Sequence, residues 1–122
     1  MQSRAPRLVL AFCSLLLAFG AFAHAKAFRS AASVIRTAQL PSIYGSDFKA
    51  LWLSDSTTLL TVAALFAAVA LRPSIASRTL VFMIALIPAA TAIFIYIFVG
   101  AFYAGHLLLG TAVAAVLASF RL

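Results

Sequence analysis

A few side chains in this largely apolar chain are of types and at positions that could support chemistry. A carboxylate beside an imidazole can exchange a proton, and a phenol can extend such a relay. Because Asp55 and His106 would each be costly to bury alone in hydrocarbon, we expect the two to contact each other. With the topology developed below, the candidate outer-end cluster and its interfacial tryptophan anchor are His24, Trp52, Asp55, Tyr96, Tyr103 and His106.

Other uses of these residues stay open. Asp55 lies in the stretch Ser54–Asp55–Ser56–Thr57, which also fits a helix N-cap, and His106 could simply reach interfacial water. His24 and His106 could instead be axial ligands of a haem, or contacts for a quinone, from two helices at similar depth.

Common enzyme motifs are missing from the sequence. It contains no HExxH or CxxC motif and no phosphate-binding glycine loop, and its single cysteine, Cys13, has no partner for a redox pair. We therefore expect a protein that is not an enzyme and that carries no metal and no cofactor.

The composition predicts an integral membrane protein. Of the 122 residues, 66% are hydrophobic and 9% are charged, with a mean hydropathy of +1.15, whereas an average soluble domain has roughly 25% charged residues. The net charge of +7 comes from basic residues at the ends of apolar runs, where they mark topology. The expected partner is therefore the lipid bilayer and not a nucleic acid.

The apolar runs predict an all-α fold, a four-helix transmembrane bundle that forms a single domain over residues 1–122. Each crossing needs about 20 apolar residues. The uncharged stretch 79–120 is twice that length, so we expect it to turn near Gly100, with Gly105 as the other candidate. The predicted spans are residues 8–24, 50–71, 79–99 and 102–120.

The first apolar run has two interpretations. It follows a basic stretch and ends at Ala23–His24–Ala25, the small-x-small pattern of a signal-peptidase site. Residues 1–25 are therefore either a cleaved signal peptide or a retained first span, and we favour the retained span.

An amphipathic segment follows this run. Over residues 26–40, basic positions such as Lys26 and Arg36 lie on one helical face, and apolar positions such as Phe28 and Ile35 lie on the other. The pattern predicts an interfacial helix between spans 1 and 2, with its apolar face in the membrane. A solvated extension of the first span that packs on the other helices is the alternative.

Basic residues near the span ends predict the orientation. A bacterial inner-membrane location with both termini in the cytoplasm puts both acids and the uncharged third connection outside. The inner residues are then Arg4, Arg7, Arg72, Arg78 and Arg121, and the outer ones are Lys26, Arg29, Arg36 and Lys49.

Small residues recur at helical spacing in every span, as close packing between membrane helices requires. Pro88 predicts a kink in the third span, because it leaves the carbonyl of Ile84 without its usual donor. The predicted seams are Ala11, Ser14, Ala18 and Ala21; Thr57, Thr61, Ala64 and Ala68; Ala85, Ala89 and Ala92; and Gly110, Ala114 and Ala118.

These features favour a non-catalytic accessory or interaction subunit that packs on other membrane proteins or on a second copy of itself. The alternative is a small proton- or ion-linked transporter that uses Asp55 and His106. In size and helix number the chain resembles the small multidrug resistance exporters, but it lacks the carboxylate that this family carries in the middle of its first span. A haem or quinone protein is the third hypothesis.

Overall fold

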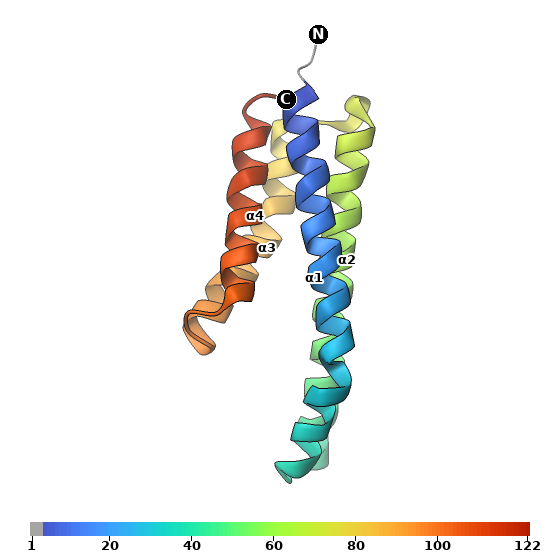
Figure 1. Ribbon diagram of the computed structural model, residues 1–122, viewed down its shortest axis with the longest axis vertical. Helices are drawn as coiled ribbons and strands as arrows, with labels where there is room; N and C mark the ends of the chain where they lie inside the picture. The colour runs from blue at the N-terminus through green and yellow to red at the C-terminus, as the bar shows by residue number, and fades with distance from the viewer. Residues whose placement is uncertain (1–3) are drawn as a thin grey trace.

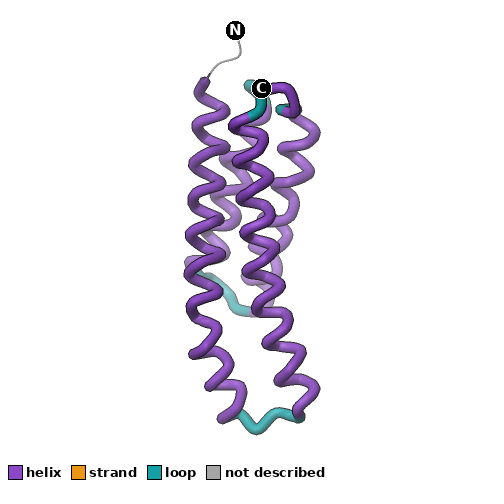
Figure 2. The backbone as a smooth tube through the Cα atoms, turned by 90° about the vertical axis from the view of Figure 1, so that its right-hand side faces the viewer, coloured by secondary structure: helices purple, strands orange, loops and turns teal. Residues whose placement is uncertain are grey.

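Four helices make up residues 4–122, the part of the chain that the computed structural model describes (Figure 1). Figure 2 shows the helices running along a common direction, joined by short loops. The all-α prediction is confirmed. The first three helices are long and apolar enough to cross a membrane, whereas the fourth is a shorter apolar helix. Their bounds are α1 Arg4–Thr37, α2 Ser42–Leu71, α3 Arg78–Phe98 and α4 Tyr103–Ser119, with a 3-10 turn, η1, at Pro73–Ile75.

The turn between α3 and α4 lies at Gly100, the first of the two predicted positions. Gly100 has a φ of 90°, a left-handed conformation that residues other than glycine rarely adopt. Gly105 lies inside α4 instead, where a Cβ would stand 3.0 Å from the Tyr96 ring. The second glycine therefore permits close approach of α3 and α4 and does not form the turn. Residues 1–3, which start the predicted basic stretch, lie outside the described residues.

Contacts between α1 and α2 follow the two helices from one end to the other. At one end, Arg7 Nε donates to the backbone carbonyl of Ala70 at 2.7 Å. This places a cation on the last carbonyls of α2, the negative end of the helix dipole. Towards the other end, a Cβ on Gly45 would lie 3.4 Å from Ile35 Cγ2. The two helices therefore form one long antiparallel hairpin.

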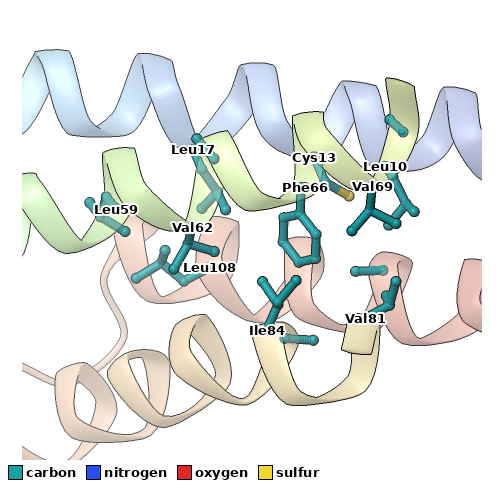
Figure 3. Packing of buried hydrophobic residues seen from close by; sticks show 14 of the residues in the cluster. Leu10, Cys13, Leu17, Leu59, Val62, Phe66, Val69, Val81, Ile84 and Leu108 are labelled. Carbon is teal, nitrogen blue, oxygen red and sulfur yellow. The ribbon is translucent and has the colours of Figure 1, made fainter. Parts of the chain in front are cut away.

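The α1–α2 hairpin packs on a second, shorter hairpin of α3 and α4. The two meet mainly where α1 lies beside α4, and α2 and α3 touch least. Figure 3 shows large apolar side chains from all four helices meeting between the hairpins. The largest of these with little or no exposure are Leu10, Leu17, Val62, Phe66, Val69 and Val81, and Leu108 of α4 joins them.

Two buried polar side chains fasten α1 to its neighbours. Ser14 Oγ donates to the carbonyl of Ala63 in α2 at 2.7 Å, and Cys13 Sγ lies 3.7 Å from the carbonyl of Thr111 in α4. Hydrogen bonds of this kind between helices in apolar surroundings contribute on the order of 1 kcal/mol each. They fix the rotation of α1 more than they add stability.

The small-residue seams are right for α1 and α3 and wrong for α2. Ser14 and Ala21 are buried, as are Ala85 and Ala92, and α3 continues as a helix through Pro88. On α2 the predicted Thr57, Thr61 and Ala64 are exposed. Leu59, Val62, Ala63 and Phe66, on the other side of the helix, face inward instead. The α4 seam is mixed, with Ala118 buried and Gly110 exposed.

No separate interfacial helix lies between α1 and α2 in the described residues, so this part of the predicted fold needs correction. Residues 26–37 continue α1 without a break, because neither glycine nor proline interrupts them. Phe28 and Ile35, on the apolar face, are half-buried, and Ile35 lies against the start of α2. The apolar face thus packs on α2, as in the alternative interpretation.

The α1–α2 hairpin extends well past the turn between α3 and α4 (Figure 1). α1 has 34 residues and α3 has 21, so α1 is longer by roughly 20 Å at a rise of about 1.5 Å per residue. Both described ends of the chain and the α2–α3 connection lie together at the opposite end (Figure 1). We call residues 26–51, which form the extension, the projecting hairpin.

The close approach at Gly105 predicts a position-specific effect of adding one methyl group. Gly105→Ala should lower the free energy of unfolding by about 1–3 kcal/mol, because the new Cβ would push against the Tyr96 ring. Gly110→Ala is the matched control, since nothing lies within 4 Å of a Cβ there and alanine favours helix by up to about 1 kcal/mol. Unfolding in detergent micelles measures both. Equal effects of the two variants would contradict the proposed approach of α3 and α4.

Candidate functional site

His24 is the centre of a polar cluster between α1 and α2. Its Nε2 lies 3.6 Å from Asp55 Oδ2, and its Nδ1 lies 2.9 Å from Ser56 Oγ. The Trp52 ring stacks on the imidazole with centroids 4.2 Å apart and an angle of 12° between the planes. The indole Nε1 donates to the backbone carbonyl of His24 at 2.8 Å. We call His24, Trp52, Asp55 and Ser56 the His24 cluster.

Helical spacing on α2 assembles the His24 cluster. Trp52 and Ser56 are one turn apart and face α1 together, while Asp55 lies beside Ser56 at the edge of the contact. The imidazole is 29% and the carboxylate 39% exposed, so the ion contact is partly open at the surface. Trp52, predicted as an interfacial anchor, links two helices here.

Ser56 has two hydrogen-bond contacts in this cluster. Its Oγ lies 2.9 Å from His24 Nδ1 and 3.2 Å from the carbonyl of Trp52 in its own helix, and its single proton serves one of the two. In either tautomer, Ser56 and Asp55 occupy the two ring nitrogens of His24.

His106 belongs to a second pair on the other hairpin. Its Nδ1 lies 2.8 Å from Tyr96 Oη, and the two rings are tilted with centroids 5.5 Å apart. Tyr103 does not join them: it is 73% exposed and lies against Phe102, at a centroid distance of 4.3 Å. The pair bridges α3 and α4 just beyond the Gly100 turn.

The expected contact between Asp55 and His106 does not form, because each residue contacts a partner on its own hairpin. Asp55 faces α1, the helix on which α2 packs most closely, whereas α2 and α3 touch little. The N-cap interpretation of Asp55 is also wrong, since α2 begins at Ser42 and carries Asp55 in its interior. The predicted cluster therefore divides into His24 with Trp52 and Asp55, and Tyr96 with His106.

Sequence reasoning missed Ser56, although a signal for it existed. Ser56 is 8% exposed and follows Trp52 by one helical turn, so a continuous helix through residues 50–57 would have placed both on one face. The N-cap interpretation of residues 54–57, which leaves Trp52 outside the helix, hid this relation. Ser56 is the residue that orients the His24 ring.

The geometry restricts cofactor chemistry at the two histidines. Both ring nitrogens of His24 face protein groups, Ser56 and Asp55, and one nitrogen of His106 faces Tyr96. Within residues 4–122, no group of three or more histidine, cysteine or acidic side chains lies close enough together to hold a metal ion. The histidines face groups on separate hairpins, so they do not form a shared pair of axial ligands here.

Comparison with known proteins gives no family for this chain: no protein-family model matches it, and no similar curated protein or solved structure is found. The evidence for its function lies in the residues of this chain and in the surfaces that the fold leaves open.

The division into two pairs predicts which substitutions interact energetically. His24→Phe keeps a ring for Trp52 but removes both nitrogens, so its combination with Asp55→Asn should be non-additive by about 0.5–1 kcal/mol in unfolding experiments. His106→Phe combined with Asp55→Asn is the control and should be additive within about 0.3–0.5 kcal/mol. Energetic coupling between the His106 and Asp55 substitutions, without coupling between those at His24 and Asp55, would instead support a contact between Asp55 and His106.

Proposed function

We propose that this chain is a non-catalytic accessory subunit of a membrane protein assembly and docks on its partner through the projecting hairpin. The observation that carries the proposal is that this hairpin extends beyond α3 and α4 (Figure 1) while keeping a large apolar surface uncovered. Its exposed apolar side chains are Val34, Leu40, Ile43, Tyr44, Phe48 and Leu51.

The projecting hairpin exposes these apolar side chains outside the bundle, which favours a protein partner. α3, with 21 residues, is about 31 Å long and matches the hydrocarbon thickness of about 30 Å. The projecting hairpin then lies at and beyond the lipid headgroups. Large apolar patches in that position are typical of protein interaction sites.

The charges of the projecting hairpin indicate the kind of surface it fits. It carries several basic side chains and one acid, Asp47. An acidic rim around an apolar centre on the partner would complement it. The basic side chains are Lys26, Arg29, Arg36 and Lys49.

The His24 cluster supports this role by fixing the base of the hairpin. The ring stacking and the hydrogen bonds from Trp52 and Ser56 hold α1 and α2 together where the hairpin leaves the bundle. A rigid docking element loses less conformational entropy on binding than a flexible one. Proton-linked transport, the alternative function, would have to use His24 with Asp55, because His106 faces Tyr96.

The proposal includes four spans in a bacterial inner membrane with both termini in the cytoplasm. α4 has 17 residues, about 26 Å of helix, and the chain on either side completes its crossing. Alkaline phosphatase fused after Ser77 should be inactive, because the basic α2–α3 connection stays inside, and a fusion after Gln39 should be active. Phosphatase activity of the Ser77 fusion alone would show that the orientation is the opposite one.

Photo-crosslinking tests the docking role directly. A photoreactive residue in place of Ile43 should give one discrete adduct with another membrane protein in cells. The control is Leu15 in the bundle, which is 69% exposed compared with 65% for Ile43 and should give only lipid adducts.

Substitution of the same surface gives the complementary result. Ile43→Asp should abolish the adduct from a photoreactive residue at Leu51, because a carboxylate in an apolar interface is left without compensation. Adducts that are the same at Ile43 and Leu15 would argue against a docking hairpin, and a crosslink between two copies of this chain would indicate a homo-oligomer.

A further inference from the structure

A groove lies at the opposite end of the molecule, between the first turns of α1 and the last turns of α4. Its volume is about 610 Å³, within the range of about 300–1,000 Å³ that is usual for ligand sites. Its walls are almost entirely apolar, and one charged side chain, Arg121, stands among them. The apolar walls are Ala5, Pro6 and Val9 from α1, and Ala114, Leu117 and Phe120 from α4 and its C-terminal turn.

The walls of the groove are held by the fold. Pro6 is buried, and the Arg78 guanidinium lies 3.9 Å from the centroid of the Phe120 ring, a cation–π contact that fixes the ring. Arg7 is engaged with the carbonyls of Ala70 and Leu71. Arg121 remains as the exposed cation of the groove.

The charged side chains at this end of the molecule are all basic. The acidic side chains of the chain, Asp47 and Asp55, both lie in the first half of α2, towards the projecting hairpin. In residues 4–122 the single side-chain ion contact is that of His24 with Asp55. The groove therefore opens among arginines with no carboxylate side chain paired to them.

We infer that this groove binds an anionic phospholipid, with an acyl chain along the apolar walls and the phosphate at Arg121. A guanidinium binds phosphate oxygens through charge-assisted hydrogen bonds, and basic pockets between membrane helices select anionic headgroups. A zwitterionic lipid would bring its ammonium group among the arginines. A soluble phosphate would leave the apolar walls unused.

This inference rests on the proposed membrane-spanning arrangement, which puts the helix ends at the headgroup level, and not on docking by the projecting hairpin. The two ideas fail separately, because a protein without a partner can still select a lipid. The site is at the end of the molecule that carries both described chain ends (Figure 1).

Native mass spectrometry of the full chain, released from mixed micelles, tests the site. With phosphatidylglycerol and phosphatidylcholine in equal amounts, the protein should retain phosphatidylglycerol preferentially, and Arg121→Gln should lower that retention about fivefold. Arg36→Gln is the matched control, because it removes the same charge from the projecting hairpin, and it should leave retention unchanged.

Variants that fill the groove test the acyl-chain part. Ala114→Phe should reduce retention without removing charge. Because Ala114 is half-buried, Ala5→Phe at an exposed position provides a second filler that leaves the core unchanged. A photoactivatable phosphatidylglycerol should crosslink to α1 or α4 at Val9 or Leu117.

Three results would overturn the inference. Equal retention of the two lipids would remove the headgroup selectivity, and equal losses in Arg121→Gln and Arg36→Gln would show general charge attraction. Displacement of the lipid by glycerol phosphate at similar concentration would show an anion site without an acyl groove.

Discussion

The antiparallel packing of α1 on α2 is the contact on which the remaining structure depends. It runs from the Arg7 contact at the end of α2 to the close approach of Ile35 and Gly45, and between these it includes the bond from Ser14 to Ala63. Lipid supplies no hydrophobic drive for helices to associate, so close packing and a few hydrogen bonds must hold such a pair. The length of the contact compensates for the small energy of each part.

Three features follow from this packing. It turns Leu59, Val62 and Phe66 towards the centre, where the α3–α4 hairpin can cover them. It directs Asp55 to α1, and hence to His24. It also continues past the bundle, where Ile35 packs on the start of α2 and Phe28 is half-buried. The projecting hairpin is thus a consequence of the same contact that builds the core.

The two ends of the molecule consequently differ in chemistry. One end gathers arginines around the α2–α3 connection and an apolar groove, and the other extends as a hairpin with mixed basic and apolar surface. The His24 cluster and the pair of Tyr96 with His106 each fasten one hairpin near this second end. Neither pair joins the two hairpins, which are held together by the apolar core and by the contact of Cys13 with Thr111.

The sequence by itself determined the helical class, the approximate limits of the apolar segments and the turn at Gly100, because hydropathy, charge and glycine conformation are local properties. It also identified five residues of the polar contacts, namely His24, Trp52, Asp55, Tyr96 and His106. Only the tertiary structure decided which histidine meets Asp55 and which face of α2 turns inward. The apolar side chains of α2 are not confined to one face of the helix. Its rotation therefore depends on the sum of many weak contacts with α1, which no local sequence pattern contains. Contacts with α2 also decided that residues 26–37 extend α1. Their amphipathic pattern by itself fits a neighbouring helix as well as a membrane surface.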